Sequence, residues 1–159
     1  MRRVLAIAAV LIAIAVITSV ETSSGRRAEG NQFAERWITA WNSHDSAKVV
    51  PLFTADVVYE DVAFGEINHG TEELKKFSGE FFLAVPDLNM QLAECSIEGN
   101  HGSIEWLMSG TDKGVFKTGK KFKVRGVSII TLDHGKISRN LDYYDSASIM
   151  KQVGLLPAS

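Results

Sequence analysis

The 159-residue sequence contains a single cysteine and almost no net charge. Because Cys95 has no partner in the chain, an internal disulfide is excluded and the core must be held together by packing. The formal charge of -2, without a long block of basic residues, argues against a nucleic-acid-binding protein. With 45% apolar residues, the chain is long enough to form one self-stabilising domain.

Common signatures of nucleotide, nucleophile and metal sites are also missing. The sequence has no glycine-rich phosphate loop, no nucleophile elbow and no repeated acidic metal-binding loop. Its histidines fall in expected turns or loops, and none has metal-ligand spacing to another histidine or a carboxylate. We therefore expect neither a cofactor nor a metal.

A long hydrophobic run is present at the N-terminus. Residues 4–17 are all apolar and follow the basic Met1-Arg2-Arg3, as in a secretory signal peptide. The run is short for a membrane span, which takes about 20 residues, but its extension through Val20 leaves a membrane anchor as the alternative. We expect residues 1–20 to be a signal peptide or a tether formed by residues 4–20, and residues 21–30 to be a linker. The domain, residues 31–157, is expected outside the cytoplasm.

Helical spacing and strand-like alternation predict an α+β fold in this domain. Phe33, Trp37 and Trp41 recur every four residues and indicate a helix. The expected helices are 31–43, a short and irregular 47–53 containing Pro51, a third that Thr71 caps and Pro86 ends, and a closing helix from Asp145 or Ser146 to Gly154. The expected strands are 57–61, 88–98, 101–111, 121–132 and 136–144, and 64–70 is expected to be a loop. Such an order predicts helices covering one face of a curved sheet.

The last hairpin brings polar groups together. If residues 133–135 form its loop, Leu132 faces Lys136 and Gly126 faces Asp142. Side chains alternate along a strand, so one face carries small and polar residues and suits a pocket wall. This face comprises Gly126, Ser128, Asn140, Asp142 and Tyr144, and the opposite face comprises Val127, Ile129, Leu141 and Tyr143.

Several fragments in this order resemble the SnoaL-like polyketide cyclase (ester cyclase) family of the NTF2-like superfamily. The fragments are 40–45, 52–61, 106–111, 135–137 and 152–157, and the resemblance extends over about 33–157. It implies a cone in which three N-terminal helices pack on a curved mixed or antiparallel sheet, followed by a short C-terminal helix. It also implies an apolar pocket and, in many members, a homodimer formed through the outer sheet face. Gly110-Thr111-Asp112 departs from the family, since many members have a histidine after this Gly-Thr pair.

Asp142 is the leading catalytic candidate, because the resemblance places it where the family's cyclases carry an acid/base aspartate. Burial among aromatic residues would raise its pKa toward neutrality. Alternatively, Asp142 accepts hydrogen bonds from a helix end or pairs with Arg125 or Arg139. Tyr59, as a donor to an oxyanion, and Asp61 are the next candidates. The expected pocket residues are Trp37, Trp41, Phe64, Phe82, Trp106, Met108, Gly126, Ser128, Asn140 and Tyr144, although burial in a core also explains the aromatic ones.

Three functions are compatible with these residues. The first is a cofactor-independent enzyme that moves a proton on an apolar carbonyl compound, in a cyclisation or isomerisation. The second is a non-catalytic binder of an apolar small molecule outside the cytoplasm. The third is a dimerisation module with a vestigial pocket, whose interior would be collapsed and filled.

Overall fold

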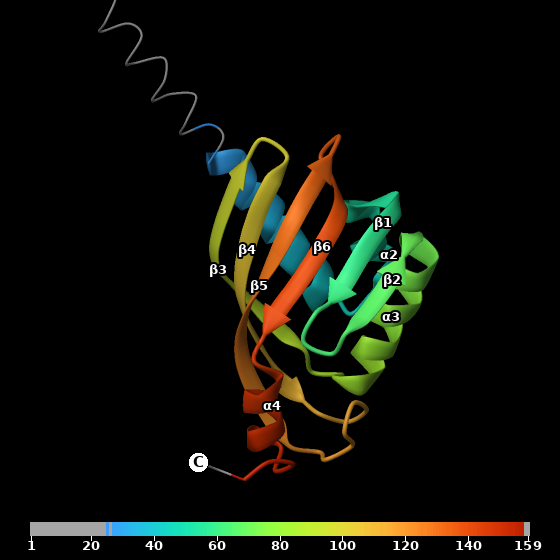
Figure 1. Ribbon diagram of the computed structural model, residues 1–159, viewed down its shortest axis with the longest axis vertical. Helices are drawn as coiled ribbons and strands as arrows, with labels where there is room; N and C mark the ends of the chain where they lie inside the picture. Colours follow the sequence, from blue (N-terminus) through green and yellow to red (C-terminus); the bar gives the residue numbers. More distant parts are fainter. Residues whose placement is uncertain (1–24, 26, 158–159) are drawn as a thin grey trace, which may run out of the picture.

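The computed structural model describes residue 25 and residues 27–157, which form helices and one sheet (Figure 1). Residues 27–42 are helical; the elements that follow are α2 (Ser46–Val49), a 3-10 turn (Val50–Leu52), β1 (Phe53–Asp61), β2 (Glu66–His69), α3 (Gly70–Ala84), β3 (Asn89–Glu98), β4 (His101–Thr111), β5 (Lys121–Asp133), β6 (Lys136–Tyr144) and α4 (Ser146–Gln152). The expected signal peptide or anchor falls on residues outside this description, so it stays a prediction. Within the described ranges, no helix is long and apolar enough to cross a membrane.

The sheet is mixed, with strand order β2-β1-β6-β5-β4-β3. β1 and β6 run parallel, and each of the other neighbouring pairs is antiparallel. The helix at 27–42 lies behind the sheet, while α3 runs alongside β1 and β2 (Figure 1). α2 has only four residues and α3 follows β1 and β2, so the expected arrangement of three N-terminal helices is not confirmed.

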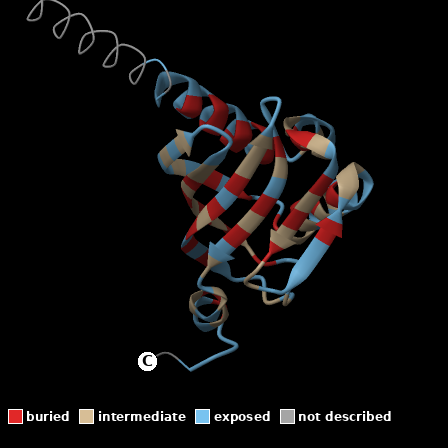
Figure 2. Ribbon diagram, turned by 45° about the horizontal axis from the view of Figure 1, so that its top comes forward, coloured by how far each residue is buried: buried red, intermediate tan, exposed pale blue. Residues whose placement is uncertain are grey.

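The helix at 27–42 covers the sheet because its apolar residues form one stripe. Its buried residues are Gly30, Phe33, Ala34, Trp37, Ile38, Ala40 and Trp41, whereas the residues between them are mostly exposed (Figure 2). This spacing of three and four is that of an amphipathic helix. The stripe meets buried residues of the strands, including Met90, Ile104 and Trp106, in one core.

Several details of the first half differ from expectation, and the first helix already includes residues 27–30 of the expected linker. Pro51 ends regular helix early, so α2 stops at Val49 and Phe53 already begins β1. The expected loop at 64–70 contains β2, an edge strand of four residues paired with β1. α3 starts one residue before Thr71, and the N-cap position is occupied by His69, whose backbone N–H donates to the Glu73 carboxylate at 2.6 Å.

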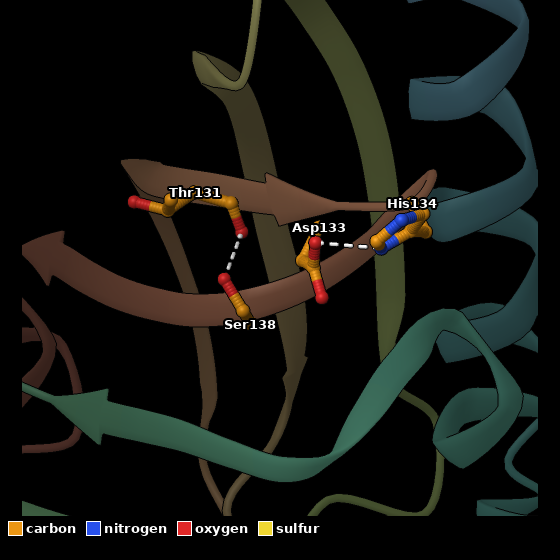
Figure 3. Close-up of polar contacts among 4 residues, drawn as sticks. All are labelled: Thr131, Asp133, His134 and Ser138. Atoms are coloured by element: carbon orange, nitrogen blue, oxygen red, sulfur yellow. Dashed lines mark hydrogen bonds and ion pairs between the residues drawn. The ribbon is translucent and has the colours of Figure 1, made fainter.

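The β5–β6 connection (Figure 3) also differs from expectation. The pairing of β5 with β6 beyond it is shifted by two residues from the expected register. Asp133 pairs with Lys136, so the loop has two residues, His134 and Gly135, both with positive φ, as in a tight type I′ turn. Ser138 is an extra residue in β6 between two pairs, and its hydroxyl donates to the Thr131 carbonyl at 3.2 Å. The shorter loop and the bulge each move the register by one residue, and together they restore the expected side-chain faces.

The connection from β4 to β5 folds over one end of the sheet. The buried Asp112 carboxylate accepts hydrogen bonds from the backbone N–H groups of Phe116 and Thr118, at 2.9 and 2.8 Å. The N–H of Lys113 donates to the carbonyl of Ala84 at 2.8 Å, which ties this connection to the end of α3. These bonds hold Phe116 against Phe64, next to the cavities described below.

Candidate active site between the parallel strands

The parallel pair β1 and β6 brings the candidate acids together. Tyr59 is the register partner of Asn140, and Asp61 is the register partner of Asp142. Partners in a parallel pair present their side chains on the same face, and all four residues are buried there. A sheet position that joins residues far apart in sequence thus creates one polar cluster inside an apolar core.

Asp142 is held by three side-chain donors. Its Oδ1 accepts from Ser128 Oγ at 2.6 Å and from Asn140 Nδ2 at 2.7 Å, and its Oδ2 accepts from the hydroxyl of Tyr59. Ser128 in turn accepts a hydrogen bond from the indole of Trp106 at 3.0 Å. The carboxyl group is therefore fixed in orientation by side chains from β1, β4, β5 and β6.

No cation neutralises Asp142 among the residues that the structure describes. Arg125 instead lies 3.9 Å from Glu105, and Arg139 is exposed. The donors to Asp142 belong to strands, not to a helix end. The two structural alternatives for this residue, an arginine pair and a helix end, therefore do not describe this site.

Burial sets the acidity of the cluster. Burial raises the pKa of Asp142 to about 6, although its three hydrogen bonds act in the opposite direction, and the charge of Asp61 adds to the rise. Burial, followed by the charge of Asp142, raises the pKa of Tyr59 well above its ordinary value. Tyr59 therefore acts as a neutral hydrogen-bond donor, while Asp142 changes charge near neutral pH.

Asp61 forms a second acid–tyrosine pair beside the first. Its Oδ2 accepts from the Tyr144 hydroxyl at 2.7 Å, and its Oδ1 accepts from the backbone N–H of Phe64 at 3.2 Å. Burial raises the pKa of Asp61, against the hydrogen bond from Tyr144. Asp61 thus starts the following turn and also faces the cavity of Asp142.

Two small cavities adjoin these acids. The inner one, of about 30 Å³, is lined by Trp37, Trp41, Tyr59, Asp61, Phe77, Phe81, Met90, Trp106, Met108, Asp142 and Tyr144. The outer one, also about 30 Å³, is lined by Phe64, Phe81, Val85, Met108, Asp112, Val115, Phe116, Phe122, Tyr144 and Ile149. Each has room for about one water molecule. Phe81, Met108 and Tyr144 belong to both walls and separate the two spaces.

The expected pocket residues divide into those that line a cavity and those that lie behind it. Trp37, Trp41, Trp106, Met108 and Tyr144 line the inner cavity, and Phe64 lines the outer one. Ser128 and Asn140 stand behind Asp142 as its donors. Gly126 leaves room for the ring of Trp106, and Phe82 packs edge-on against Trp41.

Three residues that line the inner cavity, Phe77, Phe81 and Met90, were not among the expected pocket residues. Phe77 and Phe81 are one helical turn apart on α3, and their rings stack at 6.3 Å. In the sequence, their spacing of four residues indicates one face of a helix, but it does not distinguish a pocket wall from an ordinary hydrophobic core. Among residues 27–157, no group of three or more histidine, cysteine, aspartate or glutamate side chains is arranged to hold a metal ion.

Comparison with known proteins places the chain in a family. The model of the SnoaL-like domain matches residues 34–140, which is most of the described chain. The chain belongs to the SnoaL-like family. A relative, cyclase aurE from Calcarisporium arbuscula, is 32% identical over 111 residues, which cover 69% of this chain and 82% of the relative. Family membership supports small-molecule binding and chemistry of the cyclase or isomerase type.

Solved structures show the same fold. A protein with a ketosteroid isomerase-like fold from Catenulispora acidiphila, crystallised with trimethylamine, has a TM-score of 0.71 and 24% identity, covering 77% of this chain and 92% of that one. A SnoaL-like polyketide cyclase from Jannaschia has a TM-score of 0.71 and 15% identity, covering 82% and 95%. This SnoaL-like chain therefore has the α+β NTF2-like fold, with helices packed on a six-stranded mixed sheet.

Proposed function

We propose that this SnoaL-like protein binds an apolar carbonyl compound and catalyses proton transfer at carbon, using Asp142 and no cofactor. The observation that carries the proposal is the setting of Asp142: a buried carboxyl without a cationic partner in the described chain, on the wall of an aromatic cavity, with its pKa raised to about 6. General bases work best when their pKa lies near the working pH.

The chemistry assigned to Asp142 is that of a general base and then a general acid. Its carboxylate takes a proton from the carbon next to the carbonyl group, and the C–H electron pair forms the enolate double bond. The proton held on Asp142 exchanges with solvent, and the protonated carboxyl then delivers a proton, or a deuteron in D₂O, to carbon after the bond rearrangement. The donors Tyr59, Ser128 and Asn140 keep the carboxylate oriented through both steps.

A ligand must open the site, because pockets for organic molecules usually measure about 300–1,000 Å³. A surface hollow of about 370 Å³ lies beside the inner cavity and shares Phe77 and Phe81 with it. Both phenylalanines are only half-buried. We assign the route inward to this part of α3, where rotation of Phe81 would join the hollow to both cavities.

The small cavity volume is the observation that favours a second candidate function. A filled interior is what a dimerisation module with a vestigial pocket would have, and a non-catalytic binder of a small ligand is also compatible with it. These alternatives differ from the enzyme in one requirement, since only the enzyme depends on the ionised Asp142 carboxylate.

Deuterium exchange tests the enzyme directly, with 2-tetralone as a neutral, bicyclic probe ketone. The exchange of its α-hydrogens in D₂O is followed by ¹H NMR with and without protein. We expect the wild-type protein to accelerate exchange, and Asp142→Asn to slow it by about 10² or more, which is typical of a lost general base. Asp133→Asn, at the exposed β5–β6 turn, is the matched control and should keep the wild-type rate. Exchange no faster than buffer, or equal rates for wild type and Asp142→Asn, would overturn the proposal.

A further inference from the structure

Two tryptophans that line the inner cavity have a buried indole N–H group without a hydrogen-bond partner in the described chain. Trp37 and Trp41 are 1% and 2% exposed, and neither Nε1 finds an acceptor in the described part of the chain. Trp106, in the same wall, donates to Ser128 at 3.0 Å. Since buried donors are almost always paired, two unpaired donors beside one cavity require an explanation.

Both indoles belong to the helix at 27–42, one turn apart, with ring centroids separated by 5.8 Å. The centroid of Trp41 lies 6.1 Å from that of Tyr59, the donor to Asp142. The acids line the inner cavity from the sheet, and the two tryptophans that carry the unpaired donors line it from the helix. The proposed base and the tryptophans with unpaired donors thus belong to one cavity wall, on elements that face each other across the core.

The two tyrosine hydroxyl groups in the wall of the inner cavity already donate hydrogen bonds to the acids. The Tyr59 hydroxyl donates to Asp142, and the Tyr144 hydroxyl donates to Asp61. The sequence suggested Tyr59 as the donor to an oxyanion, but its hydroxyl donates its hydrogen bond to Asp142, the proposed base. An indole N–H only donates and does not titrate, so it suits a carbonyl oxygen at any working pH. A bound acceptor would satisfy a donor that is costly to leave unpaired in a buried wall.

We propose that the indole N–H groups of Trp37 and Trp41 bind the carbonyl oxygen of the ligand and stabilise the enolate that forms from it. This assignment rests on the proposed function. When the α-proton moves to Asp142, the C–H electron pair forms the carbon–carbon double bond and the carbonyl π pair moves onto oxygen. The indoles keep their hydrogens and hold the resulting negative charge by hydrogen bonding, as an oxyanion hole does.

Indole NMR signals test this binding mode without turnover. The three tryptophans give three indole ¹H–¹⁵N signals, and the already paired Trp106 serves as an internal control. The probes are 2-tetralone and tetralin, which share a ring system but only the first of which carries a carbonyl oxygen. We expect 2-tetralone to move the indole proton signal of Trp37 or Trp41 downfield, and tetralin to cause no such shift. The Trp106 signal should respond equally to both probes. Equal responses of Trp37 and Trp41 to the two probes, or no response to either, would overturn the assignment.

The catalytic part is tested by Trp37→Phe and Trp41→Phe, which retain an aromatic ring but remove the donor. Loss of one oxyanion donor should lower kcat for 2-tetralone exchange by about 10² with a smaller change in KM. Unchanged kcat in both variants would contradict the enolate role. Asp142→Asn separates the two proposals, because it should slow exchange by about 10² or more and leave the indole shift intact. An indole shift in a wild-type protein that exchanges no deuterium would reject the enzyme and retain the carbonyl site.

Discussion

Tyr144 donates its hydroxyl hydrogen to Asp61 at 2.7 Å, across the same parallel strands on which Tyr59 donates to Asp142. The two pairs are related by register: in each, the tyrosine lies on one strand and the aspartate on the other. The strands thereby place two buried carboxyl groups on one cavity wall. Their charges repel, which is one cause of the raised pKa of Asp142.

The first prediction follows from this repulsion. Asp61→Asn removes a negative charge beside Asp142 and keeps a side chain of the same size, so the pKa of Asp142 should fall below about 6. Because Asp142 must be ionised to act as a base, the rise of 2-tetralone exchange with pH should move to lower pH. The pH–rate profiles of the two proteins measure this shift. A pH–rate profile that does not move, or that moves to higher pH, would show that the two carboxyl groups do not interact.

Much of the sheet could be predicted because its pattern is local. β4 and β6 have the expected bounds, and the inner face of the last hairpin was identified by alternation. Alternation placed Asp142 on this face together with Ser128 and Asn140, and the family resemblance singled out Asp142 as the catalytic candidate. Alternation survives a shift of two residues, and for that reason the faces were right although the turn length and register were wrong.

Features that depend on tertiary contacts were not predictable. β2 is a polar edge strand of four residues, whose pairing with β1 overrides a weak local pattern. The parallel pairing of β1 with β6, which joins Asp61 to Asp142, leaves no signal in either segment. The volume of the cavity depends on how Phe77 and Phe81 pack, which spacing alone does not specify.

The second prediction concerns stability and pH. The pKa of Asp142 is raised in the folded protein from 3.8 to about 6, so the folded state binds more protons than the unfolded state between these values. Its contribution to stability is complete below the unfolded pKa and is lost as pH rises through the folded pKa. Relative to Asp142→Asn, the wild type should lose about 3 kcal/mol of unfolding free energy across this window. Urea unfolding of both proteins at pH 4 and pH 7 measures the difference, and a pH-independent difference would contradict the raised pKa.

The third prediction concerns Gly126. A Cβ at this position would overlap the ring of Trp106, which would have to move away from Ser128. Gly126→Ala should therefore lower stability by about 1–3 kcal/mol. Gly79→Ala is the control: it lies in α3, its Cβ would sit 3.5 Å from Ser46 Oγ, and it should raise stability by roughly 0.5–1 kcal/mol. Thermal unfolding of both variants is the measurement, and equal effects would refute the role of Gly126.

The fourth prediction concerns the route into the cavity. Phe81 borders both cavities and the surface hollow, so Phe81→Ala should connect them and speed the binding of 2-tetralone. Stopped-flow tryptophan fluorescence gives the association rate. Leu83→Ala also borders the hollow, but Leu83 is 80% exposed, and this control should bind at the wild-type rate. If Phe81→Ala binds no faster than the wild type, the ligand enters elsewhere.

The fifth prediction concerns assembly. We propose that two copies dimerise through the outer sheet face formed by Val127, Ile129, Leu141 and Tyr143, of which Ile129 is 42% and Tyr143 45% exposed. Sedimentation of the wild type should show a dimer, and Ile129→Lys should give a monomer. Val115→Lys, 46% exposed and on the β4–β5 connection, should remain a dimer. A wild-type monomer at high concentration would end this proposal.

The most direct test of the central claim is the titration of the Asp142 carboxyl carbon by ¹³C NMR, with its signal assigned by its loss in Asp142→Asn. The account predicts a midpoint near pH 6, because burial without a cation opposes ionisation. A midpoint at or below the ordinary value of 3.8 would show that the three hydrogen bonds outweigh burial. Asp142 would then be a permanently ionised structural group, and the proton-transfer role would be contradicted.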